Sequence, residues 1–439
     1  TDWGTSNGRY VESANSGHDL FMTIDMGDFR HALNGALSNG SMSWGRLDDA
    51  VRRNLRVKFR LGLFENPYGD AEQVQVTILQ PAFREKALEM ARKSMVLLKN
   101  EALSAKVRLL PLDTGSVKRL ALIGPLADDQ QEILGCWHRI GRAEDCESVY
   151  SGLQAALPEV EIDLLRGCDL DGAQAVDFSP AIAAAQAADI VIMVLGEAEA
   201  MSGEAHSRAY LALPGRQEDL LRAVVAAGKP VVVVLLCGRP LLIPWMAENV
   251  GAILLAWHGG IRTGQAVADL LVGRANPSGK LTASWPRAQG QVPIYYARKN
   301  TGRPGGGTGT LQFDRLHRTW FIDEASEPLF PFGYGLSYCE FAYSDLQVVA
   351  PQGVEGTLVV TAVVANTSGV PGDEIAQLYV RDLVGEVTRP VKELKGFRRI
   401  SLAPGEAKQV TFELPVAELG FHGLDMAYKV EPGDFKVWV

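Results

Sequence analysis

The sequence is poor in several features that define particular classes of protein. It has only five cysteines, none in a CxxC pair, which argues against a zinc site or a disulfide framework, although Cys136 and Cys146 could pair. The longest apolar run, residues 231–237, ends at Gly238, far short of the about 20 residues that span a membrane. Acidic residues outnumber basic ones, giving a net charge of −9. This balance disfavours nucleic acids and anionic membranes as partners.

The sequence also has no initial Met and no recognisable signal peptide. It opens TDWGTSNGRY, where Asp2 and Trp3 precede the turn residue Gly4 with no strand or helix before them. On pattern alone, Asp2 is an Asx-turn or N-cap residue and Trp3 is a packing residue. We expect the chain to be part of a longer protein whose compartment is encoded before Thr1.

Length and composition indicate an ordinary globular protein of several domains. The chain has 439 residues, 47% of them apolar and 22% charged, which suits about three domains. Residues 18–24 predict a strand and residues 28–40 a helix. A second helix is predicted from Ser43, its N-cap, to Gly62. These elements cannot bury a core alone and indicate the tail of a larger α/β domain, followed by a polar linker over residues 67–82.

Residues 118–287 carry the clearest pattern. Short runs rich in Val, Ile and Leu alternate with helical segments, which is typical of a mostly parallel sheet covered on both faces. The predicted strands are residues 119–125, 160–167, 189–197, 230–238 and 250–260, and the predicted helices include 179–188, 215–227 and 263–273. Residues 288–337 are irregular and rich in Gly and aromatics. Residues 341–439 alternate apolar and polar side chains between turn signals, which predicts an antiparallel sandwich.

One loop after a predicted strand is unusually long. Residues 197–214 separate the strand that ends near Glu197 from the next helix, and they hold three carboxylates, Glu197, Glu199 and Glu204. Ligands bind beyond the carboxyl ends of such strands, and long loops there are often functional. A solvated acidic loop and a catalytic acid both remain open. A nucleotide site is disfavoured because no Gly-rich loop joins a strand to a helix.

A series of motifs, in order, resembles the C-terminal three-fifths of the family 3 glycoside hydrolases, the β-glucosidase family. TDWG resembles the family's nucleophile motif, and ARKSMVLLKNE with LPLD resembles the entry to its second domain. Later landmarks are ALIGPLAD, GRPLLI, WHGGIRTGQAVADLLVGRANPSGKLTASWPR, PLFPFGYGLSY and ELKGFRRISLAPGE. The resemblance covers nearly the whole chain.

The resemblance implies an α/β multidomain architecture. Residues 1–66 would be the C-terminal part of a TIM-like barrel and residues 67–90 a linker. Residues 91–300 would form an α/β sandwich domain with a mostly parallel sheet. An irregular linker over 301–340 would lead to a fibronectin type III-like sandwich over 341–439.

By the same resemblance, Asp2 is expected to be the catalytic nucleophile and Glu204, in SGEAHSRAYLALP, the general acid/base. Glu197 is the alternative for the second role. Trp3 would line the sugar-binding site, and Trp137 would lie near the entrance to that site. His206 and Arg208, beside Glu204, are interpreted as residues that tune it or hold its loop.

The expected reaction is retaining hydrolysis of terminal β-D-glucosyl residues through a covalent glycosyl-enzyme intermediate, with no metal or organic cofactor. The expected partners are a glucoside or small oligosaccharide and a barrel portion encoded before Asp2, with a homodimer as a further possibility. The resemblance also suggests cellulose degradation in a periplasmic or secreted location. β-Xylosidase or α-arabinofuranosidase activity, and a non-catalytic carbohydrate-binding role, remain as alternatives.

Overall fold

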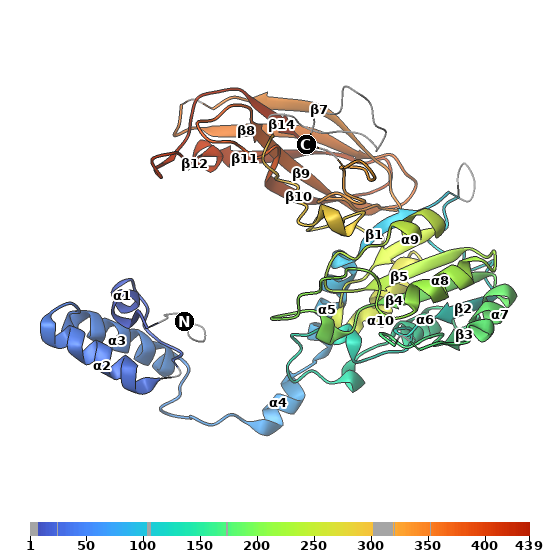
Figure 1. Ribbon diagram of the computed structural model, residues 1–439, viewed down its shortest axis with the longest axis horizontal. Coiled ribbons are helices and arrows are strands. Elements are labelled where there is room, and N and C mark those ends of the chain that lie inside the picture. Colours follow the sequence, from blue (N-terminus) through green and yellow to red (C-terminus); the bar gives the residue numbers. More distant parts are fainter. Residues whose placement is uncertain are drawn as a thin grey trace. The chain divides into compact units, whose positions relative to one another are not determined.

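The computed structural model describes residues 8–23, 25–102, 107–172, 174–301, 319, 321–351 and 353–439 (Figure 1). Two of the predicted site residues, Asp2 and Trp3, lie outside this described part. The chain divides into two compact units, Thr1–Gln80 and Pro81–Val439.

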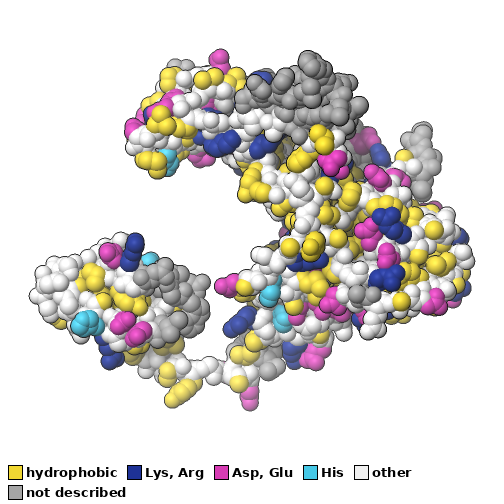
Figure 2. All heavy atoms as spheres, in the orientation of Figure 1, with side chains coloured by type: hydrophobic (Ala, Val, Ile, Leu, Met, Phe, Trp, Pro, Cys, Tyr) yellow, Lys and Arg dark blue, Asp and Glu magenta, His cyan; other side chains and the backbone are white. Residues whose placement is uncertain are grey.

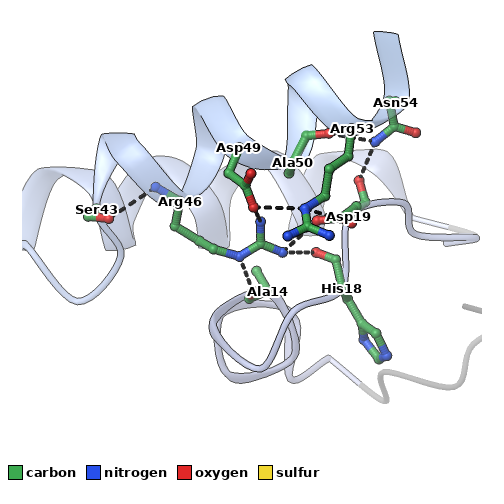
Figure 3. Close-up of polar contacts among 9 residues, drawn as sticks. All are labelled: Ala14, His18, Asp19, Ser43, Arg46, Asp49, Ala50, Arg53 and Asn54. Carbon is green, nitrogen blue, oxygen red and sulfur yellow. Dashed lines mark hydrogen bonds and ion pairs between the residues drawn. The ribbon is translucent and has the colours of Figure 1, made fainter. Parts of the chain in front are cut away.

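The described part of the first unit is helical. Its helices are α1 (Tyr10–Asn15), α2 (Met26–Asn39), α3 (Trp44–Arg60) and α4 (Ala71–Thr77). The predicted N-cap of α3 is confirmed, because the Ser43 hydroxyl accepts a hydrogen bond from the backbone N–H of Arg46 at 3.1 Å. The Arg46 guanidinium in turn donates to the carbonyl oxygens of Ala14 and His18 and to Asp19 (Figure 3). One partly buried arginine thus ties the end of α1 and the loop after it to α3.

One prediction for this unit is wrong. Residues 18–23 form no strand, because Phe21 instead packs edge-on against Tyr10 at a ring-centroid distance of 6.1 Å and the segment pairs with no strand among the described residues. The segment 67–82, which the sequence predicts to be a polar linker, contains α4. The carboxylate of Asp70 caps that helix by accepting from the N–H groups of Glu72 and Gln73.

The second unit contains a six-stranded sheet in the order β1-β6-β5-β4-β2-β3. Strands β2 to β6 run parallel, as predicted, and β1 pairs antiparallel with β6 at the edge. The strands are β1 (Val96–Asn100), β2 (Arg119–Ile123), β3 (Glu161–Leu165), β4 (Ile190–Gly196), β5 (Val231–Leu236) and β6 (Ala252–Leu255). Every residue of β4, β5 and β6 is buried, which explains their continuous runs of aliphatic side chains.

Helices cover both faces of this sheet. One face packs against α5 (Pro81–Ser94), α6 (Val149–Ala156) and α10 (Thr263–Leu271). The other face packs against α7 (Ser179–Ala187), α8 (Gln217–Val225) and α9 (Pro244–Asn249). Short 3-10 helices occupy the loops: η1 (Glu132–Leu134), η2 (Ala143–Asp145), η3 (Glu199–Met201), η4 (Gly260–Arg262) and η5 (Gln289–Gln291).

The C-terminal part of the second unit is the predicted antiparallel sandwich. One sheet has the order β10-β9-β14 and the other β11-β8-β7, with a small β12-β13 pair beside them. The elements are β7 (Phe341–Val349), β8 (Thr357–Asn366), β9 (Gly372–Asp382), β10 (Glu393–Leu402), β11 (Ala407–Pro415), η7 (Val416–Leu419), β12 (Phe421–His422), β13 (Tyr428–Lys429) and β14 (Phe435–Trp438). Alternate side chains of β8 point into the core, in the burial pattern that its period-two sequence predicts.

The surface charges of the second unit are mixed in sign (Figure 2), and the thiols of the chain are free. Acidic and basic side chains are interspersed over the visible face of the second unit (Figure 2). All five cysteines are free thiols, so Cys136 and Cys146 do not form the bond that the sequence left open. Within the described residues, no helix has the length and apolar character needed to cross a bilayer.

Candidate active site

The carboxyl ends of β2 and β4 mark the point where the strand order of the sheet reverses. After β2 the chain moves outward to β3, whereas β4 returns to the other side of β2 and leads on to β5 and β6. Ligands of open α/β sheets bind at such a switch point. The two loops that leave these strand ends hold Trp137 and Glu204, respectively.

Glu204 lies exposed at the tip of the loop after β4. Its two neighbours have left-handed backbone conformations, with φ of +111° at Gly203 and +62° at Ala205. A Cβ at Gly203 would lie 2.9 Å from the sulfur of Cys136, so the close approach of the two loops requires glycine there. A left-handed alanine is strained by about 1–3 kcal/mol and persists only where the surroundings impose it.

Glu197 stands at the base of the same loop and is completely buried. Its Oε1 accepts a hydrogen bond from Nη1 of Arg208 at 2.6 Å and lies 3.2 Å from Nε of Arg239. Its Oε2 has no hydrogen-bond partner within the described residues. Both arginines pair with this carboxylate, which lies away from the solvent.

A polar network connects the loop after β4 to the loop after β2. The carboxylate of Glu199 accepts from the Gln131 amide at 3.0 Å and pairs with Nε2 of His138 at 3.1 Å. The backbone N–H of Glu199 donates to Glu132 at 2.5 Å, and burial raises the pKa of the Glu132 carboxyl. Trp137 precedes His138 and is 67% exposed, so its indole is free to meet a ligand beside the Glu204 loop.

His258, in the loop after β6, lies beneath these segments. Its Nδ1 donates to the carbonyl of Glu132 at 3.0 Å, and its Nε2 has no partner within the described residues. Burial lowers the pKa of His258, which favours the neutral ring that this bonding pattern needs. The hydroxyl of Ser202 is also buried without a partner among the described residues. A Cβ added at Gly238 would collide with the Ser202 side chain and lie 3.6 Å from Nε2 of His258.

The structure brings together only part of the predicted site. Glu204, Trp137, His206 and Arg208 come from two adjacent loops, whereas Asp2 and Trp3 lie outside the described residues. Sequence reasoning missed Arg239, His258 and the pair of Glu199 with His138. Arg239 and Glu199 follow directly after the predicted strands 230–238 and 189–197, and that position was the available signal. His258 fell inside the predicted strand 250–260, which ends earlier, at Leu255. No cluster of side chains able to hold a metal ion occurs in the part of the chain that the structure describes.

The fold and this strand-end site define a two-domain module, in which an α/β sandwich with a long acidic loop is followed by a β-sandwich. Residues 95–338 match the glycosyl hydrolase family 3 C-terminal domain, and residues 374–439 match the fibronectin type III-like domain. The chain belongs to glycosyl hydrolase family 3.

Named relatives agree with this family. The chain is 38% identical over 434 residues to a periplasmic β-glucosidase of Salmonella typhimurium, covering 93% of this chain and 55% of the relative. It is 41% identical over 402 residues to a β-xylosidase of Formosa agariphila, covering 90% of this chain and 53% of the relative. The chain therefore spans about half the length of the curated relatives it matches.

Solved structures give the same picture. A β-glucosidase from Listeria innocua crystallised with laminaribiose superimposes with a TM-score of 0.85 at 36% identity, over 98% of this chain and 57% of that one. A β-glucosidase of intestinal bacteria involved in saponin metabolism gives a TM-score of 0.81 at 33% identity, over all of this chain and 64% of the other.

Proposed function

We propose that this chain is part of a retaining β-glucosidase that removes terminal non-reducing β-D-glucosyl residues. The observation that carries the proposal is the placement of Glu204, an exposed carboxylate on a strained loop tip at the switch point of a family 3 domain. Relatives named β-glucosidase, and one solved with laminaribiose, support the substrate class.

In the proposed mechanism Asp2, in the TDWG motif, attacks the anomeric carbon while Glu204 protonates the leaving oxygen. Glu204 then removes a proton from the water that hydrolyses the glycosyl-enzyme intermediate. Retaining chemistry requires the two carboxyl groups to lie about 5–5.5 Å apart. Trp3 and Trp137 would offer apolar ring faces to the sugar. The proposal includes a TIM-like barrel that residues 1–66 complete, and the domain boundaries of the sequence analysis stand as part of it.

The roles of the two carboxylates are tested by substitution in the whole protein. Asp2→Asn is expected to abolish turnover of an aryl β-glucoside. Glu204→Ala is expected to lose about 10²–10⁴-fold in activity on substrates with poor leaving groups. Added azide should restore turnover of a dinitrophenyl glucoside by Glu204→Ala, giving a β-glucosyl azide.

The exposed Glu248, on the same domain, provides the matched control, and Glu248→Ala should behave as the wild type. Retained activity in Asp2→Asn would refute the nucleophile assignment. Azide rescue in Glu197→Ala but not in Glu204→Ala would move the acid/base role. An α-anomer as the first product of hydrolysis, seen by NMR, would rule out retention.

β-Xylosidase activity is the second candidate, because a β-xylosidase is among the relatives at 41% identity. The ratio of kcat/KM for an aryl β-glucoside to that for an aryl β-xyloside decides between β-glucosidase and β-xylosidase activity. Hydrolysis of an aryl α-arabinofuranoside tests for α-arabinofuranosidase activity. Binding of sugars without hydrolysis of any of these substrates would instead support a carbohydrate-binding role. A periplasmic location is proposed from the Salmonella relative, and cellulose degradation and a homodimer remain proposals from the sequence.

A further inference from the structure

The loop that presents Glu204 is fastened at several points to one buried ion-pair cluster. This cluster, called here the arginine clamp, consists of Glu197, Arg208 and Arg239. Arg239 Nη2 donates to the carbonyls of Met201 and, at 2.9 Å, His206. Arg208 Nη2 donates to the carbonyl of Ala212 at 3.1 Å. The fastened carbonyls therefore lie on both sides of Glu204 in the sequence.

The two arginines depend on Glu197 for their own positions. Glu197 is fixed at the end of β4, where its backbone N–H donates to the Leu236 carbonyl at 2.8 Å. The side chains of Arg208 and Arg239 are only 21% and 19% exposed, and a mostly desolvated guanidinium needs a carboxylate partner. Glu197 therefore connects the rigid sheet to the loop through charge.

The local backbone shows why such a fastening matters. The left-handed conformations at Gly203 and Ala205 hold the carboxylate of Glu204 at the apex of a strained turn, and strain of this kind relaxes unless neighbouring contacts oppose it. The Met201 and His206 carbonyls, which Arg239 holds, bracket that turn directly.

We propose that the arginine clamp positions Glu204 for proton transfer, with Glu197 acting as a positioning residue and not as an acid. This inference rests on the proposed function, in which Glu204 is the acid/base. Loosening the clamp should misplace the carboxylate of Glu204 without removing it. Displacements of about 1 Å can lower a rate by about 10²-fold.

The test uses the whole protein and two glucosides that differ in leaving group. Proton donation matters for a poor alkyl leaving group and little for dinitrophenolate. Glu197→Gln is therefore expected to lower kcat/KM for the alkyl glucoside by about 10²-fold and for the dinitrophenyl glucoside by much less. Azide should raise kcat on the dinitrophenyl substrate, as in Glu204→Ala.

Arg208→Lys is the second variant, because it keeps the charge but loses the guanidinium fork. It should show the same leaving-group dependence to a smaller degree, and it carries the test if Glu197→Gln does not fold. Asp269→Asn is the matched control, since the side chain of Asp269 is 3% exposed and pairs with Arg92 in the same domain. The ratio of kcat/KM for the alkyl glucoside to kcat/KM for the dinitrophenyl glucoside should be the same in Asp269→Asn as in the wild type.

An equal loss on both substrates in the clamp variants would reduce the clamp to a stability element and overturn the inference, as would no loss at all. Glu204→Ala separates this failure from that of the proposed function. If Glu204→Ala itself shows neither leaving-group dependence nor azide rescue, the acid/base assignment fails and the inference fails with it.

Discussion

At the scale of single residues, His258 makes the stability of the fold depend on pH. Burial lowers its pKa from the ordinary value of 6.5, although the nearby carboxylates of Glu197 and Glu199 oppose this shift. Just below pH 6.5 the unfolded chain therefore binds a proton that the folded chain does not. The free energy of unfolding should fall as pH drops through this range, until the pH passes below the lowered pKa.

His258→Asn keeps an N–H donor for the Glu132 carbonyl and removes the titration. We expect the decrease in Tm between about pH 7.5 and about pH 5.5 to be smaller in this variant than in the wild type. The exposed His422 gives the control, and His422→Asn should leave the pH dependence unchanged. An unaltered slope in His258→Asn would show that other groups account for the acid sensitivity.

At the scale of secondary-structure elements, α6 and α10 touch through their backbones. A Cβ at Gly152 would lie 2.1 Å from the carbonyl oxygen of Gly264. Gly152→Ala must therefore push the helices apart, at a cost of about 1–3 kcal/mol in the free energy of unfolding. Gly35 in α2 is the matched control because a Cβ there meets nothing within 4 Å, and Gly35→Ala should add about 0.5–1 kcal/mol.

Hydrogen exchange measured helix by helix checks both substitutions. Amides of α6 and α10 should exchange faster in Gly152→Ala, and amides of α2 should exchange more slowly in Gly35→Ala. Unchanged protection of α6 and α10 in Gly152→Ala would mean that the two helices do not pack as closely as their backbones indicate.

Elements with an unambiguous pattern were predictable from the sequence, whereas those that depend on context were not. The short aliphatic runs of β4 and β5, rich in Val and Ile, favour buried strands, and Ser43 before an apolar repeat at four-residue spacing indicates the start of α3. The strand prediction for residues 18–24 was wrong because the local sequence alone cannot reveal whether a neighbouring strand exists to pair with. Helix α4 was missed because its exposed, polar sequence lacks an apolar face and only Asp70 marks its start.

At the scale of the whole molecule, the residues of the candidate site were predictable from the sequence, but their burial and pairing were not. Strand ends and a long loop indicated Glu204 and Glu197, but their different burial follows from contacts across the sheet. Arg239 reaches Glu197 from the end of β5, and no spacing in the sequence predicts that pairing. The sequence therefore supplied candidates, and packing separated an exposed carboxylate from a buried one.

Also at this scale, the α/β and β-sandwich parts of the second unit are joined by Asn276, from the segment after α10. Its Oδ1 accepts from the hydroxyl of Ser337 at 2.8 Å and the N–H of Tyr338 at 2.9 Å. Its Nδ2 donates at 3.1 Å to the carbonyl of Pro371, the residue directly before β9. Since one amide binds both parts, they should unfold together.

Calorimetry of the whole protein tests this coupling. The wild type should show one transition for residues 81–439, and Asn276→Ala should split it or lower its Tm, because each lost hydrogen bond removes about 0.5–1.5 kcal/mol and leaves partners unpaired. The control is Asn249→Ala, which removes only a bond to the Trp245 carbonyl one turn earlier in α9. A single, unshifted transition in Asn276→Ala would place the coupling instead in the other contacts between the two parts, such as the ion pair of Lys280 with Glu374 at 3.2 Å.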